Sequence, residues 1–236
     1  MGYLYETHCH TREVSACASA SGEEQVRKYH AMGYSGVMIT DHFFNGNTCV
    51  DRSKSWEEMC EQYCKGFENA KKAGDELGMT VMFGIEYTYH GTDFLIYGLD
   101  KDWLKAHPEI MDIKVPELSR LVHTDGGLFV HAHPFREADY IDTIRLFPHD
   151  VDAVEVYNAG NRSDAMNERA EYYAESYGLV MTSGSDAHHL SQEIYGGVAT
   201  KRPVTGIEDY IELVKANALE DLLKKYSPPE SKQNGG

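Results

Sequence analysis

Histidine and acidic residues occur along this chain in pairs that are separated by a single residue. The pairs are His8 and His10, His131 and His133, and Asp186 and His188. In extended chain, residues two apart face the same side, so each pair can direct two ligand atoms at one point. Neutral imidazole and carboxylate groups suit zinc, manganese or iron. The spacing therefore predicts metal binding.

Further candidate ligands lie in or directly after apolar runs typical of buried strands. Asp41 and His42 follow "SGVMI", and Glu86 lies in "TVMFGIEYTY". Burying so many imidazoles and carboxylates is costly unless they bind something. One ion takes three or four protein ligands, so the set predicts two or three divalent ions, with Glu86 or Asp186 free to bridge. The predicted ligands are His8, His10, His42, Glu86, His131, His133, Asp186 and His188.

Alternating strands and helices must position these side chains. The sequence predicts strands over 3–10, 35–42, 80–89, 92–99, 127–134, 151–158, 179–189 and 196–200, with a turn at His90-Gly91. It predicts helices over 21–33, 55–78, 137–147, 163–178 and 206–219, with Ser21, Ser55 and Ser163 as N-caps. After the strand over 92–99 it predicts further helical structure to about residue 124, with a break at Pro116. This alternation favours a parallel sheet with crossover connections, and the length favours a barrel. Barrel active sites lie at the carboxyl ends of the strands, where the candidate ligands fall.

Length and composition predict one domain over 1–226 and a disordered polar tail over 227–236. The net charge of −16 argues against extended contact with nucleic acid, but metal ions can reverse the local potential for a small phosphorylated substrate. No apolar stretch approaches the roughly 20 residues that span a bilayer, so no membrane contact is expected. Five cysteines without a secretory framework favour a cytoplasmic location. The sequence does not indicate an oligomeric state.

The order of the motifs resembles that of the PHP (polymerase and histidinol phosphatase) family. The motifs are "HCH" at 8–10, "ITDH" at 39–42, "GIE" at 84–86, "HP" at 133–134 and "GSDAH" at 184–188, and the resemblance covers about residues 3–200. It implies an α/β fold, a distorted (β/α)7 TIM-like barrel, with two or three metal ions at the carboxyl ends of the strands. It also implies hydrolysis of phosphoesters.

The resemblance further implies how the ligands are divided among the ions. His8, His10, Glu86 and Asp186 would share one ion, Glu86 and His133 a second, and His42 and His188 a third. The chain departs from the family pattern at the third ion, where Ser15 and Ala16 align with the usual ligand and Cys17 or Glu13 is the alternative. It also departs at the second ion, which Asp93 or His131 could complete.

The predicted reaction is hydrolysis of a small phosphorylated metabolite, in which a metal-bound hydroxide attacks the phosphorus atom. Asp41 is predicted to orient His42, because a metal-bound histidine usually needs a partner for its other nitrogen. Arg136 and Arg162 are predicted to bind the phosphate, with surface salt bridges as the alternative. Two other functions stay open: a metal-dependent hydrolase of a non-phosphate substrate, similar to amidohydrolases, and a non-catalytic metal-binding domain.

Overall fold

The computed structural model describes residues 2–227. Met1 and residues 228–236 lie outside this range, and with them nearly all of the predicted tail. Within residues 2–227 no helix has the length and apolar character needed to cross a membrane.

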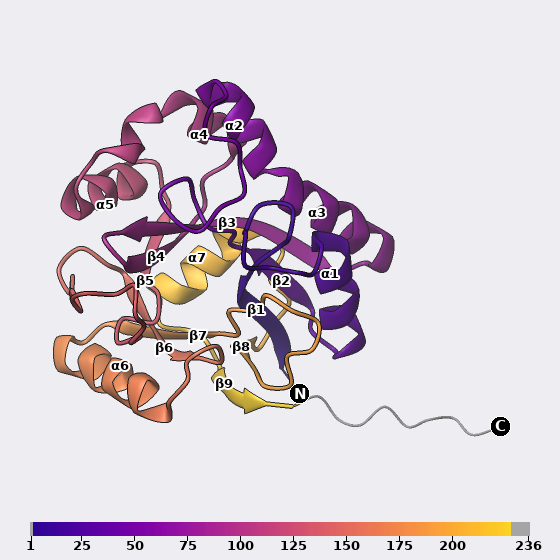
Figure 1. Ribbon diagram of the computed structural model, residues 1–236. Coiled ribbons are helices and arrows are strands. Elements are labelled where there is room, and N and C mark those ends of the chain that lie inside the picture. Colours follow the sequence, from indigo (N-terminus) through magenta and orange to yellow (C-terminus); the bar gives the residue numbers. More distant parts are fainter. Residues whose placement is uncertain (1, 228–236) are drawn as a thin grey trace.

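One mixed sheet of nine strands forms the body of the protein, in the order β7-β6-β5-β4-β3-β2-β1-β8-β9 (Figure 1). The strands are β1 (Tyr3–Cys9), β2 (Gly36–Ile39), β3 (Thr80–Tyr89), β4 (Thr92–Tyr97), β5 (Leu128–His131), β6 (Ala153–Asn158), β7 (Val180–Gly184), β8 (Tyr195–Thr200) and β9 (Asp221–Tyr226). The eight predicted strands are present, and β9 is an addition that pairs with β8.

The sequence predicted a parallel sheet, but the observed sheet is mixed. β1 to β3 and β5 to β7 form two parallel runs, but β4 is antiparallel to both of its neighbours. The cause is the turn at His90 and Gly91, which have φ of 50° and 78°. Two successive residues with positive φ form a tight hairpin turn, so β4 returns beside β3 without a crossover helix.

The sheet curls into a nearly closed barrel because the chain after β7 meets β1. Ala187 and Cys9 form a parallel bridge, in which the His10 amide donates to the Ala187 carbonyl at 2.9 Å. β8 lies antiparallel to the first half of β1, and the Gly197 amide of β8 donates to Ser183 Oγ of β7 at 3.1 Å. The predicted barrel class is confirmed, with nine strands instead of seven. The closure places residues 186–188 beside residues 8–10.

Helices surround the barrel, and their serine caps are as predicted. The helices are α1 (Gly22–Ala31), α2 (Trp56–Tyr63), α3 (Lys65–Leu77), α4 (Lys101–Ala106), η1 (Pro108–Met111), α5 (Val115–Thr124), α6 (Asp164–Tyr177) and α7 (Ile207–Lys215). Ser21 and Ser55 form capping boxes with Glu24 and Glu58, and Ser163 caps α6. Pro116 lies in the first turn of α5, where proline is tolerated, so it begins that helix and does not interrupt one.

Two helix predictions were wrong. The single helix expected over 55–78 is divided at Cys64 into α2 and α3. The segment 137–147 forms no helix, and none of its residues is buried. Short helices depend on packing an apolar face against the core, and in this segment only the last residue, Phe147, packs against the apolar core cluster.

α7 closes the end of the barrel opposite the carboxyl ends of the parallel strands (Figure 1). Tyr210 and Ile211 of α7 belong to an apolar cluster with Tyr97 and Leu128, and Lys215 Nζ donates to the Gly127 carbonyl at the start of β5. With this end filled by apolar side chains, polar side chains can gather at the other end.

Candidate metal centre

Glu86 of β3 lies at the centre of a group of histidines. Its Oε1 is 3.1 Å from His8 Nε2 and 3.1 Å from His133 Nε2. Its Oε2 is 3.5 Å from His10 Nε2 and in contact with His42 Nδ1. The Glu86 side chain is 1% exposed. Strand ends from three parts of the sequence therefore converge on one buried carboxylate.

Asp186, in the chain that follows β7, is the second carboxylate of this group. Its Oδ1 is 3.1 Å from His10 Nε2 and 3.5 Å from both His8 Nε2 and His188 Nδ1. Its Oδ2 is 2.6 Å from Arg136 Nη2. Asp186 has a φ of 53°, a left-handed conformation that redirects the chain so that Asp186 and His188 both reach the centre.

The polar atoms of this group fit a divalent cation. Glu86 Oε2, Asp186 Oδ1 and His42 Nδ1 are buried and make no hydrogen bond within residues 2–227, although ring nitrogens lie close to both oxygens. His8 Nε2 and His10 Nε2 face one another at 3.1 Å. Buried polar atoms are normally satisfied, and imidazole with carboxylate is a donor set for zinc, manganese or iron.

The ligand atoms fall into overlapping sets, each within 4.8 Å of one another. The central site is His8, His10 and Glu86, with Asp186 beside them. The outer site is Glu86, Asp93 and His133, and the three-histidine site is His10, His42 and His188. A fourth set, His8, His133 and Asp186, spans the central and outer sites. The resemblance implied a similar division but placed His10 at one ion only, and Glu86 is common to the first two sites.

Burial and mutual charge set the protonation of the centre. Burial raises the pKa of Glu86, but His42, His8 and His10 outweigh it and hold that pKa well below its usual value. Burial lowers the pKa of His8, but Glu155, Asp186 and Glu86 outweigh it and raise the pKa. Ligands bind metal in their deprotonated form, so a cation here would take the place of protons on the imidazoles.

His131 does not join the centre, contrary to the prediction. It is fully buried, its ring stacks on Phe94 with centroids 5.1 Å apart, and it meets Tyr173 of α6 edge-on. Neither ring nitrogen has a hydrogen-bond partner within residues 2–227. Burial lowers the pKa of His131 to about 3, so the ring is neutral.

The two-residue spacing failed here because the strand ends between the two histidines. β5 stops at His131, and His133 has a φ of 25°, so the alternation of an extended chain does not continue. His133 turns into the centre while His131 faces the helix layer. The outer site is completed instead by Asp93, whose Oδ2 is 3.9 Å from His133 Nε2.

Asp41 was predicted to orient the ring of His42. In the structure it supports the ring of His10 instead. Its carboxylate accepts from the Thr11 amide at 2.6 Å, from Thr11 Oγ1 at 2.7 Å and from Ser15 Oγ at 2.7 Å. Ser15 Oγ in turn lies 3.0 Å from His10 Nδ1 and accepts from the His42 amide at 3.0 Å. This Asp41–Ser15–His10 chain leaves His10 Nε2 facing the carboxylates. Burial raises the pKa of Asp41 to about 6 against these hydrogen bonds.

Helix α3 packs closely against the Asp41 end of this chain of hydrogen bonds. A Cβ on Gly66 of α3 would lie 2.6 Å from Asp41 Oδ2, so glycine is required there.

Glu155 of β6 is the corresponding support for His8. Its Oε1 is 2.9 Å from His8 Nδ1, while its Oε2 accepts from Asn158 Nδ2 at 2.8 Å and from the His133 amide at 3.0 Å. A carboxylate that holds the far nitrogen of a ligand histidine fixes its tautomer. Glu155 lies in the strand predicted over 151–158, but the sequence pattern gave it no role, and Ser15 was considered only as a position lacking a ligand.

A cavity of about 760 Å³ opens beside the centre. Its lining includes His42, Asp93, Arg136, Tyr140 and His188. Arg136 reaches it from the loop after β5, held by Asp186, by Asn158 Oδ1 at 2.8 Å and by Asn161 Oδ1 at 3.1 Å. Arg162 is exposed and is not part of this lining, so the two predicted phosphate-binding arginines are not brought together.

Cys17 and Glu13 were the two candidates for a further ligand of the third ion, and they lie in different places. Cys17 Sγ is 3.2 Å from His42 Nε2, whereas Glu13 turns away and accepts from Asn69 Nδ2 at 2.9 Å. Burial raises the pKa of Cys17, but hydrogen bonding to His188 and His42 outweighs it and brings the pKa to about 6.

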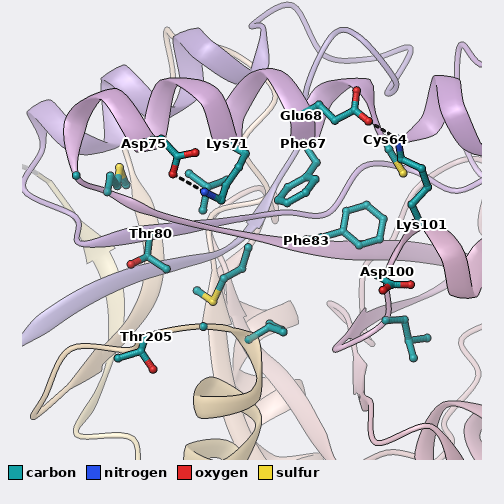
Figure 2. A pocket seen from close by; sticks show the side chains of 18 residues that line it. Cys64, Phe67, Glu68, Lys71, Asp75, Thr80, Phe83, Asp100, Lys101 and Thr205 are labelled. Carbon is teal, nitrogen blue, oxygen red and sulfur yellow. Dashed lines mark hydrogen bonds and ion pairs between the residues drawn. The ribbon is translucent and has the colours of Figure 1, made fainter.

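A second cavity, of about 570 Å³, lies between α3, β3 and the loop before α7 (Figure 2). Phe67 and Phe83 form its apolar wall. Four of its charged groups are already paired, Lys71 with Asp75 and Lys101 with Glu68, and the fifth, Asp100, caps α4 by accepting from the Trp103 amide. This second cavity is lined by none of the ligand sets named above. The candidate site is therefore the group of side chains around Glu86, at the carboxyl ends of the parallel strands.

Comparison with known proteins supports the resemblance at the level of the fold. A family model described as PHP-associated matches residues 165–194. A two-domain protein from Bacteroides vulgatus containing a predicted PHP-like metal-dependent phosphoesterase has a similar structure, with a TM-score of 0.66, 15% identity and 95% of this chain covered. This chain spans 65% of that protein. The predicted resemblance to the PHP family is confirmed by these matches.

Two further solved structures share the fold over nearly their whole length. A candidate metal-dependent phosphoesterase from Bifidobacterium adolescentis has a TM-score of 0.55 and 17% identity, with 92% of this chain and 96% of that chain covered. An amidohydrolase from Chromobacterium violaceum, with sulfate bound and no metal, has a TM-score of 0.57 and 15% identity, with 94% and 98% covered. No curated protein has a sequence that matches this chain.

Proposed function

We propose that this chain is a metal-dependent hydrolase of small phosphorylated substrates, with the central and outer sites holding its ions. The observation that carries the proposal is the pair of buried carboxylate oxygens, Glu86 Oε2 and Asp186 Oδ1, which lie among ring nitrogens without a hydrogen bond in the described chain. When bound, divalent ions lower the pKa of a coordinated water and neutralise charge on a phosphoryl group.

The chain's own residues prepare the site for this reaction. Glu155 and the Asp41–Ser15 pair hold the far nitrogens of His8 and His10, so that both Nε2 atoms are available on the same side. Arg136 lines the cavity, and its Nη1 makes no hydrogen bond to residues 2–227, so it can donate to a phosphate oxygen. The cavity has the volume of a small-molecule site, which favours a metabolite over a polymer.

Hydrolysis of a non-phosphate substrate is the second candidate. It is supported by the similarity of the fold to the amidohydrolase from Chromobacterium violaceum. The same ions would activate water for attack on a carbonyl carbon. A non-catalytic metal-binding domain is less well supported, because a cavity of about 760 Å³ opens on the centre.

The test is an assay of chelator-treated protein, reloaded with Mn²⁺ or Zn²⁺, on phosphomonoesters, phosphodiesters and amides. Phosphoester hydrolysis that needs metal is expected, and Glu86→Gln should lower its rate at least about 100-fold. His107→Ala is the matched control, because His107 is a half-buried imidazole that pairs with Glu109 away from the centre. Full phosphatase activity without metal, or cleavage of amides alone, would refute the proposal.

A further inference from the structure

The loop that follows β1 brings a thiol to the three-histidine site. Cys17 Sγ lies 3.2 Å from His42 Nε2. The ring centroids of His10 and His42 are 4.3 Å apart, those of His10 and His188 are 4.1 Å apart, and those of His42 and His188 are 5.6 Å apart. Cys17, His42 and His188 also line the same cavity. A soft sulfur donor therefore stands beside three imidazoles at the cavity wall.

The position of Cys17 is set by hydrogen bonds on both sides of it. The Ala16 amide donates to the Asn47 carbonyl at 2.9 Å, in the loop that follows His42. The Ser19 amide donates to the His188 carbonyl at 2.9 Å. The thiol is thus held between the two segments that carry His42 and His188, and this placement is built into the backbone.

The remaining cysteines have other surroundings. Cys9, Cys60 and Cys64 are buried in apolar clusters. Cys49 is exposed, and its Sγ faces the carbonyls of Arg12 and Glu13. Among the described cysteines, Cys17 alone has its sulfur beside a ring nitrogen of the three-histidine site, whereas Cys9 Sγ meets the main-chain carbonyl of His10.

We propose that Cys17 is a thiolate ligand of an ion held by His42 and His188, and that it makes this position selective for Zn²⁺, Co²⁺ or Fe²⁺ over Mg²⁺ and Mn²⁺. The proposal rests on the proposed function, because it assumes that the neighbouring carboxylate sites bind metal. On binding, the Cys17 S–H proton leaves to solvent, a sulfur–metal bond forms, and no group is oxidised or reduced. Thiolate ligation favours the softer ions of this series.

His10 need not take part in this position. Its Nδ1 is engaged by Ser15, so it has one nitrogen to offer, and Nε2 faces Glu86 and Asp186 of the central site. An ion at Cys17 would then have three protein ligands, Cys17, His42 and His188, all of which line the cavity, and a fourth ligand could be water or substrate. Three protein ligands with an open fourth position are typical of catalytic zinc and not of structural zinc.

Cobalt substitution tests the proposal without relying on activity. Chelator-treated protein is loaded with Co²⁺, and its visible d–d bands and near-ultraviolet thiolate-to-cobalt charge-transfer band are recorded. The wild type should show both, and Cys17→Ser should lose the charge-transfer band and bind this ion at least about 10-fold more weakly, while keeping d–d bands from the other sites. Cys49→Ser, the matched exposed thiol, should match the wild type.

A second variant and a second measurement guard against misfolding of Cys17→Ser. Cys17→Asp should restore the ion count with an oxygen ligand, without the charge-transfer band, and should shift the preference towards Mn²⁺. X-ray absorption of the zinc-loaded wild type should show a sulfur neighbour at about 2.3 Å that Cys17→Asp lacks.

The outcomes separate this proposal from the proposed function. Cobalt d–d bands without charge transfer in the wild type, or a charge-transfer band that persists in Cys17→Ser, would overturn the role of Cys17 and leave the metal-dependent hydrolase standing. No cobalt uptake by the wild type would overturn both.

Discussion

Removing the Ser15 hydroxyl should weaken metal binding although Ser15 touches no ion. Ser15 Oγ joins Asp41 Oδ1, His10 Nδ1 and the His42 amide, with all three contacts between 2.7 and 3.0 Å. In Ser15→Ala the His10 ring loses the partner that fixes its tautomer and orientation. Loss of such a partner typically lowers metal affinity about 10- to 100-fold, which corresponds to about 1.4–2.8 kcal/mol.

The same variant should also lose stability, because two groups lose their partner. Asp41 keeps both hydrogen bonds from Thr11, but the His42 amide and the buried His10 Nδ1 are left without Ser15 Oγ. A buried donor without a partner costs about 1–3 kcal/mol, so the free energy of unfolding of the metal-free protein should fall by about 2 kcal/mol.

Zinc titration against a chromophoric chelator measures the affinity, and urea unfolding measures the stability. The matched control is Ser119→Ala, because Ser119 is also buried, at 4% exposure, and its hydroxyl donates to the Asp150 carbonyl far from the centre. Both variants should lose stability, and only Ser15→Ala should lose affinity. Equal stability losses with unchanged zinc affinity would show that the Asp41–Ser15–His10 chain only supports the fold.

Three further predictions concern other parts of the site. His131→Phe should keep the full metal content, and should remove part of the stability loss that the wild type shows in urea as pH falls from 6.5 towards 3, where unfolded imidazole gains a proton that buried His131 does not; a loss of bound metal would contradict it. Burial raises the pKa of Glu6 from 4.5 to about 7, so the folded state holds more protons than the unfolded chain in that window and stability falls as pH rises through it. Glu6→Gln should therefore gain up to about 3 kcal/mol over the wild type in urea unfolding at about pH 9, and no gain would show that Glu6 ionises freely. Arg136→Met removes the cation beside Asp186, which should raise the pKa of that carboxyl and move the midpoint of acid-induced zinc release to higher pH; an unchanged midpoint would contradict this role.

Much of the fold could be predicted because the signals are local. Ser21 and Ser55 cap their helices through residues three positions away, and the His90-Gly91 turn depends on two backbone conformations. The failures came where distant chain decides. The 137–147 segment has the composition of a helix, but none of its residues is buried and only Phe147 at its end packs against the core. The strand β9 forms where β8 offers an edge to pair with.

The candidate site shows the same division. Sequence alone determined the donor types and their position at strand ends, because alternation within a strand and the direction of the chain are local properties. His8, His10, His42, Glu86, His133, Asp186 and His188 all reach the centre.

Only the tertiary structure decided which donors meet. The bridge between Cys9 and Ala187 closes the barrel and carries Asp186 and His188 to His8 and His10 across most of the sequence. The end of β5 at His131 sends that imidazole into the apolar layer, and the loop after β1 delivers Cys17 to His42. Side-chain direction beyond a strand end depends on how the chain turns and on what packs against it, and neither is encoded in a two-residue spacing.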